Sequence, residues 1–311
     1  MTRQDGFVGI DVSKAQLDAC LWPDGEARAF ANDPQGLRDL VRWLRRSKPQ
    51  AVGFEASGGY ERPLLAALCK ADLPARRVNP ARLRQFARAA GVLAKNDRID
   101  AAMIARFCAA LPQREARHDP VLAGLAELVT ARRQLVEERT RCTNQASQTS
   151  IAMLGRIATQ RIKRLSAEIA LVEAEIARMV AANPELAQRQ AIMRSVPGIG
   201  AATAAALTAF IPELGTMNAR QAAALTGVAP CDCESGAFKG KRRILGGRKP
   251  PRDALYMAAL VASRKNKTMA DLYQRMCNAG KPPKVALVAI MRKLITAINA
   301  MIRNNQTWHH A

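Results

Sequence analysis

Four carboxylates in the first third of the sequence are of a type that could bind a metal. Asp11 lies inside an apolar run that begins at Phe7, and Glu55 ends a second apolar run. An ionised carboxylate among apolar neighbours is costly unless it is paired or bound to a metal. Asp97 and Asp100 are spaced i, i+3 at the start of a predicted helix, so their side chains share a face.

Carboxylate oxygens are hard ligands that hold one or two Mg²⁺ ions and serve phosphodiester chemistry. Neighbouring strand ends and one packing helix can bring all four groups together, and this predicts a Mg²⁺ site made by Asp11, Glu55, Asp97 and Asp100. A different interpretation stays open for Asp97 and Asp100, because helix N-termini favour negative charge without any metal.

A second cluster is a basic, glycine-rich loop. From Ser235 to Arg252 the sequence has seven Lys or Arg and no Asp or Glu. Glycines permit close backbone approach, and arginines can hold phosphate oxygens with two hydrogen bonds. The predicted nucleic-acid contacts of this loop are Lys239, Lys241, Arg242, Arg243, Arg248 and Lys249. The Ser235 hydroxyl could attack a phosphodiester, although a serine before a glycine is more often an ordinary turn residue.

Residues 195–200, Ser-Val-Pro-Gly-Ile-Gly, join two predicted helices through a tight turn. Such a helix–hairpin–helix offers backbone N–H groups and a helix N-terminus to a phosphate. We therefore predict DNA contacts at Gly198 and Gly200, with a plain corner between two helices as the alternative.

The elements that must position these residues fall into two patterns. Three strands come first, and then helix, strand, helix, strand and two further helices follow up to residue 110. This order predicts an α/β domain of the ribonuclease-H-like kind, because a doubly wound nucleotide fold alternates strands and helices from its start.

Beyond residue 120 the pattern is helical. Apolar residues at helical spacing across 120–182 predict a long antiparallel hairpin, either a dimerising coiled coil or part of an ordinary bundle. Short helices, a loop at 230–251 and helices at 252–263 and 285–303 follow. We therefore expect domains at 1–115, 116–186 and 187–311, the last of them mainly α-helical.

Composition narrows the class of partner. The net charge is +22 over 311 residues, which favours nucleic acid first and an anionic membrane surface second. Seven scattered cysteines predict no disulfide framework, and one residue between Cys231 and Cys233 is too few for the usual zinc pair. No signal peptide or membrane span is apparent, so we expect a soluble cytoplasmic protein.

Six motifs occur in an order that resembles the insertion-sequence 110 family of transposases, which includes a 1111 subgroup. The resemblance covers nearly the whole chain. The motifs lie at residues 9–14, 55–58, 95–101, 197–200, 234–236 and 254–257.

The resemblance implies an N-terminal RuvC-like domain whose four acidic residues match Asp11, Glu55, Asp97 and Asp100. It implies a C-terminal transposase domain in which Ser235 attacks DNA and forms a transient phosphoserine linkage. It also implies direction by a structured non-coding guide RNA that pairs with donor and target DNA. The expected assembly is a dimer or a dimer of dimers, and the expected location is the bacterial cytoplasm, associated with the nucleoid.

Two other functions stay open at this point. A metal-dependent nuclease or junction resolvase would use the four carboxylates to activate water, and Ser235 would be incidental. A non-catalytic nucleic-acid-binding protein would use only the positive charge, but carboxylates near phosphates repel them unless a metal intervenes.

Overall fold

The computed structural model describes residues 6–56, 58–92, 97–232, 234–235, 238–240 and 242–308, with the backbone alone at 97–98, 234–235 and 238–239. The chain forms two compact units, residues 1–119 and 120–311, which are described separately below. The division into three domains made from the sequence stays a prediction.

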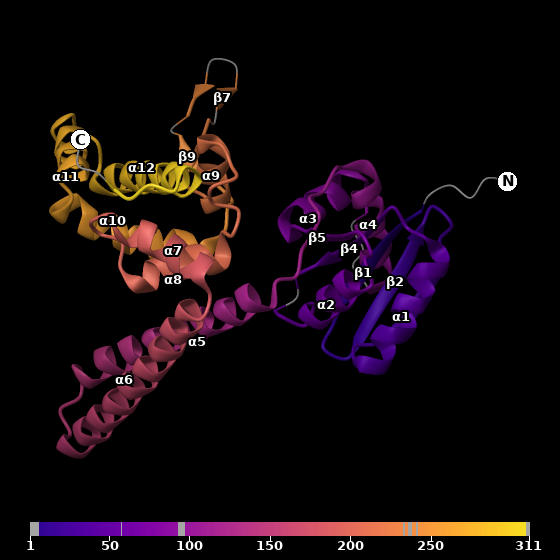
Figure 1. Cartoon of the computed structure of the whole chain (residues 1–311), viewed down its shortest axis with the longest axis horizontal. Coiled ribbons are helices and arrows are strands. Elements are labelled where there is room, and N and C mark those ends of the chain that lie inside the picture. Colours follow the sequence, from indigo (N-terminus) through magenta and orange to yellow (C-terminus); the bar gives the residue numbers. More distant parts are fainter. Residues whose placement is uncertain are drawn as a thin grey trace. The chain divides into compact units, whose positions relative to one another are not determined.

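The first unit is built on a five-stranded sheet with the order β3-β2-β1-β4-β5 (Figure 1). The first three strands are antiparallel, and β4 and β5 run parallel to β1. The predicted mixed α/β layer is therefore confirmed. The strands are β1 (Phe7–Val12), β2 (Gln16–Trp22), β3 (Ala27–Ala31), β4 (Ala51–Glu55) and β5 (Ala75–Val78).

Helices cover both faces of this sheet. Val8 and Ile10 lie on one face of β1 and pack with α1 and α2. Phe7 lies on the opposite face and packs with α3 and α4. The helices are α1 (Pro34–Ser47), α2 (Arg62–Lys70), α3 (Pro80–Ala89) and α4 (Asp97–Ala110).

Helix α4 lies directly on β1 because glycine leaves room for it. A Cβ on Gly9 would lie 2.1 Å from the Ala101 carbonyl oxygen and 2.4 Å from the Ala105 nitrogen. Five residues after Ala101, the Arg106 guanidinium lies 5.2 Å from the Trp22 ring centroid, and Trp22 pairs with Phe7 at the start of β1. Helix α4 therefore runs antiparallel to β1, and its first turn lies at the carboxyl end of that strand.

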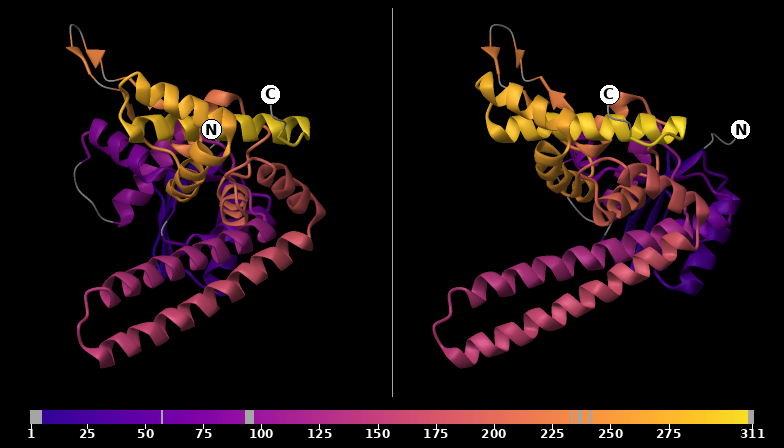
Figure 2. Two further views of the ribbon diagram at one scale, coloured as in Figure 1. Left: turned by 90° about the vertical axis from the view of Figure 1, so that its left-hand side faces the viewer. Right: turned by 60° about the vertical axis from the view of Figure 1, so that its left-hand side comes forward.

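The second unit begins with a long antiparallel hairpin of α5 (Pro120–Ala146) and α6 (Ala152–Ala181), which lie side by side in Figure 2. Ion pairs cross the hairpin between Arg132 and Glu173 at 2.6 Å and between Arg161 and Glu138 at 2.7 Å. The structure has the predicted helical hairpin, and its use as a dimerising coiled coil stays a prediction.

Helices α7, α9, α10 and α11 pack around α12, whose residues Ile290, Leu294 and Ile295 are fully buried, and α8 packs against α5, α7 and α10. Helix α12 is long and apolar enough to span a membrane by length and composition, but half of its apolar stretch is buried within this unit. The sequence did not predict α11. The helices are α7 (Pro184–Arg194), α8 (Ala201–Phe210), α9 (Ala219–Thr226), α10 (Lys249–Lys265), α11 (Lys267–Asn278) and α12 (Pro283–Asn304).

The predicted loop at 230–251 differs from the structure, which has paired strands there. Strand β6 (Pro230–Cys231) pairs with β9 (Arg243–Ile244), and β7 (Glu234–Ser235) pairs with β8 (Phe238–Lys239). We call these two ladders the arm. Helix α10 begins at Lys249, earlier than predicted, because prolines are well tolerated in the first turn of a helix.

Candidate active site

Asp11 and Glu55 occupy matching positions on neighbouring parallel strands. Each follows the last paired residues of the β1–β4 ladder, Ile10 and Phe54. By strand alternation Asp11 lies on the same sheet face as Gly9, the face that α4 covers, and Glu55 lies on the face of Gly53. Both side chains are partly buried. Two of the predicted site carboxylates therefore lie beside each other at the edge of the sheet where α4 begins.

The other two predicted carboxylates belong to the first turn of α4. This helix begins at Asp97, and partly buried Asp100 precedes the residue that contacts Gly9. The Asp97 side chain lies outside the described residues. Among the described side chains, no group of three or more His, Cys, Asp or Glu could hold a metal ion. The donor chemistry of this edge suits Mg²⁺, and the fourfold site stays a prediction.

Sequence reasoning missed one carboxylate at this edge. Asp18 on β2 pairs directly with Asp11 across the antiparallel ladder and lies on the same face. Its carboxylate accepts hydrogen bonds of 2.8 and 3.0 Å from Gln16 Nε2. The register of the β1–β2 hairpin would have revealed it, because that register fixes which side chains are opposite each other.

Ser235 lies on the arm, where its backbone pairs with Phe238, and Glu234 pairs with Lys239. The side chains of Ser235 and Lys239 lie outside the described residues, as does all of Lys241. The predicted roles of these three residues stay predictions.

The base of the arm carries exposed cations. Arg242 forms an ion pair with Asp232 at 2.5 Å, and Lys249 forms one with Asp253 at 2.5 Å. Arg243 is exposed on β9. Exposed ion pairs of this kind are weak, so such cations can exchange a carboxylate for a phosphate at little cost.

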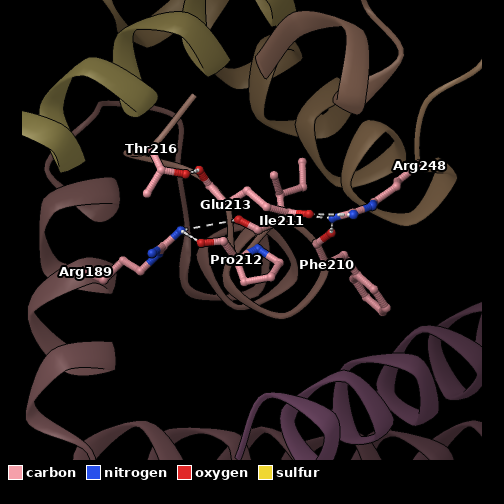
Figure 3. Close-up of polar contacts among 7 residues, drawn as sticks. All are labelled: Arg189, Phe210, Ile211, Pro212, Glu213, Thr216 and Arg248. Atoms are coloured by element: carbon pink, nitrogen blue, oxygen red, sulfur yellow. Dashed lines mark hydrogen bonds and ion pairs between the residues drawn. The ribbon is translucent and has the colours of Figure 1, made fainter. Parts of the chain in front are cut away.

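Arg248 has internal partners (Figure 3). Its guanidinium donates to both carboxylate oxygens of Glu213, at 2.7 and 2.8 Å, and to the Phe210 carbonyl at 2.6 Å. Arg189 donates to the Pro212 carbonyl of the same segment at 2.9 Å, and burial lowers the pKa of this arginine. Arg248 thus bonds to the last carbonyl of α8, Arg189 bonds to a carbonyl of the segment that follows, and Arg248 connects the return side of the arm to this segment.

The predicted turn between two helices is present at α7 and α8. Gly198 has a φ of +108°, and a Cβ there would lie 2.9 Å from the Ala262 nitrogen of α10, so this glycine is required by packing. Gly200 caps α8, and a Cβ there would meet nothing within 4 Å. Of the two glycines, Gly200 is the one with free space beside a helix N-terminus.

Asp11 and Glu55 on adjacent strands, and a serine on a basic arm, are the residue types that the predicted DNA chemistry would use. Comparison with known protein families also points to an enzyme that acts on DNA. Residues 8–150 match a family model described as a transposase, of the DEDD IS110 type, and residues 190–274 match the model for the transposase IS116/IS110/IS902 family. The chain belongs to the IS110 family of transposases, as its motifs predicted.

Two curated relatives match this chain over nearly its whole length. The pilin gene-inverting proteins of Moraxella lacunata and Moraxella bovis are 29% identical over 316 residues, which cover 96% of this chain and 96% of theirs. An uncharacterised 42 kDa protein of insertion element IS900 from Mycobacterium paratuberculosis is 28% identical over 67% of this chain and 50% of its own. The chain is therefore a transposase, a DNA-recombining enzyme of an insertion sequence.

Proposed function

We propose that this transposase cuts and rejoins DNA through a transient phosphoserine linkage at Ser235, with Mg²⁺ held by Asp11, Glu55, Asp97 and Asp100. The observation that carries the proposal is the position of Asp11 beside Glu55 on adjacent parallel strands, at the end where α4 starts. The sheet order, with three antiparallel strands followed by two parallel ones, supports a ribonuclease-H-like, RuvC-type unit.

The chemistry assigns separate tasks to the two sets of residues. The Ser235 Oγ forms a bond to the phosphorus as the bond from phosphorus to one deoxyribose oxygen breaks; the serine gives up its proton, and the departing hydroxyl takes one up. Bound Mg²⁺ would supply charge stabilisation for the phosphate in flight. The covalent link keeps the phosphodiester energy for rejoining, whereas attack by water would lose it.

Partners follow from charge and exposed surface. We propose that a structured guide RNA directs donor and target DNA to the protein. The net charge of +22 supports the binding of such polyanions. We also propose a dimer or a dimer of dimers in the bacterial cytoplasm, associated with the nucleoid. Exposed Ile151, Met153 and Ile157, which are 54–58% accessible near the tip of the helical hairpin, support contact with another copy.

The test is an adduct assay. The protein is incubated with DNA carrying its element's ends, guide RNA and Mg²⁺, then denatured and examined for protein–DNA adducts. Wild type and the exposed-serine control Ser147→Ala should form adducts, and Ser235→Ala should form none. Asp11→Asn should abolish cleavage, while the turn control Asp24→Asn should not. Cleavage by Ser235→Ala at the wild-type rate would instead support a nuclease that uses water.

A further inference from the structure

A cavity of about 340 Å³ lies in the second unit between the base of the arm and two helices. Its size is within the range of small-ligand pockets. The proposed chemistry does not use it, although it contains the tyrosine of the motif at 254–257. Six of its lining residues are Ile244 on β9, Arg252 and Tyr256 on α10, and Lys284, Val288 and Met291 on α12.

The lining combines an apolar part and a cationic part. Met291 is 2% exposed, and Val288 and Tyr256 pack against the main core of the unit, so the interior wall is apolar with one aromatic ring. Lys284 is exposed in the first turn of α12, where no side chain caps the helix. Arg252 donates to the Gly246 carbonyl at 2.7 Å.

Within the part of the chain that the structure describes, neither Arg252 nor Lys284 forms an ion pair. The one carboxylate in the lining, Asp253, is paired with Lys249 at 2.5 Å. Among the described residues the cavity therefore presents two cations without an ion pair, Arg252 and Lys284, beside an apolar, aromatic wall. Its ligand should have a flat apolar body and an attached anion.

We propose that this cavity binds one nucleotide that has left the stack of a nucleic-acid strand. The base lies against the Tyr256 ring and the apolar wall, and the phosphate lies between Arg252 and Lys284. Aromatic rings bind bases of any sequence in this way, and lysine and arginine supply the phosphate contact. This inference rests on the proposed function, because it requires a strand of nucleic acid to pass the arm.

The cavity lies at the base of the arm that carries Ser235, so a bound nucleotide could position the strand for cleavage. Ile244 pairs with Pro230 at the base of the arm. The backbone of Ser235 is four residues beyond Cys231, a span of at most about 14 Å. A nucleotide held in the cavity would therefore lie within a few nucleotides of the phosphate offered to Ser235, and it would fix which phosphate is cut.

Photocrosslinking tests the subsite with the full chain. The probes are a short oligothymidylate with one 5-iododeoxyuridine and its RNA counterpart with one 5-iodouridine. Irradiation should attach the probe to Tyr256, which mass spectrometry would find in the tryptic peptide 253–264. Tyr256→Leu should lose this crosslink and bind the probe at least about fivefold more weakly. The control Tyr273→Leu removes a tyrosine that does not line the cavity and should keep both properties.

The phosphate contact has its own pair of variants. Lys284→Ala should lower the slope of log affinity against log salt by about 0.7, as expected for one lost contact to a single strand. Lys281→Ala removes another exposed lysine, which does not line the cavity, and should leave the slope unchanged. Circular dichroism would verify that all four variants are folded. A crosslink to the DNA probe assigns the cavity to the substrate strand, and one to the RNA probe alone assigns it to the guide.

Equal crosslinking of wild type and Tyr256→Leu, or equal salt slopes for Lys284→Ala and Lys281→Ala, would overturn the subsite. The adduct assay separates this result from a failure of the proposed function. Adducts at Ser235 without a Tyr256 crosslink would support the serine chemistry and contradict the nucleotide subsite. A Tyr256 crosslink without adducts would support the subsite and contradict the serine chemistry. Ser235→Ala should crosslink as wild type does.

Discussion

Asp11 and Asp18 are directly opposite each other on the antiparallel strands β1 and β2, on the sheet face that α4 covers. Two like charges in this arrangement destabilise a sheet. A cation bound beside this pair would reduce the repulsion between the two carboxylates.

The first prediction concerns Asp18→Asn. Without metal this change should raise the melting temperature, because it removes a repulsion of about 0.2–1 kcal/mol and leaves an acceptor for Gln16. In excess Mg²⁺ the advantage should shrink, since the cation screens the same pair in wild type. Thermal unfolding in EDTA and in MgCl₂ measures both effects, with Asp24→Asn in a surface turn as the control. An unchanged or lower melting temperature in EDTA would contradict the repulsion.

The second prediction concerns the contact between β1 and α4. Gly9→Ala places a methyl group against the backbone of α4, which cannot rotate away, so it should destabilise the protein by about 1–3 kcal/mol or more. It should also reduce DNA cleavage, because the helix that carries Asp97 and Asp100 must shift. Gly155→Ala, on the surface of α6, should stabilise or change nothing. Urea unfolding with the cleavage assay measures both, and a fully active, stable Gly9→Ala would refute the close contact.

The third prediction separates two neighbouring cations of the basic loop. Arg248→Ala removes a two-pronged ion pair with Glu213 and a bond to the Phe210 carbonyl, so it should cost about 1–2 kcal/mol. Lys249→Ala removes only an exposed pair and should cost less than about 0.5 kcal/mol. Urea midpoints give the comparison. If Lys249→Ala proves the more damaging to stability, the anchoring role of Arg248 is wrong.

The fourth prediction is a pH dependence. Burial raises the pKa of the Cys108 thiol from 9.0 to about 11, against an opposing effect of the Arg76 charge. The folded state therefore keeps a proton that the unfolded state loses, and stability falls as the pH rises from about 9 to about 11. At pH 10 wild type should lose roughly 1 kcal/mol more than Cys108→Ala, relative to pH 8. Urea unfolding at the two pH values measures this, and parallel losses would show that another group is responsible.

Much of the first unit could be predicted from its sequence, because strong apolar alternation and helical spacing defined β1 to β5 and α1 to α4. The pairing of strands could not, and so Asp18 was missed although its neighbour Asp11 was found. The contact between Arg248 and Glu213 spans 35 residues of sequence and has no local signal.

In the second unit, too, some elements could not be predicted from the local sequence. The strands of the arm have two residues each, too few to show alternation, and only their partners across the turn define them. Helix α11 begins at a buried cap, Asn266, whose side chain accepts from the Met269 nitrogen. Apolar residues follow that cap at helical spacing, at Met269, Leu272, Tyr273 and Met276, so local periodicity did indicate this helix although the segment is polar on average.

The two ladders of the arm are out of phase by one residue. Two residues separate Cys231 from Glu234 on the outgoing side, whereas three separate Lys239 from Arg243 on the return side. An extra residue of this kind bends a hairpin and turns its side chains. Deleting one residue from 240–242 would leave two residues between the ladders on each side and bring the ladders into phase. Insertions and deletions in this stretch are thus a means by which evolution, or a designer, can turn the outer ladder relative to the inner one.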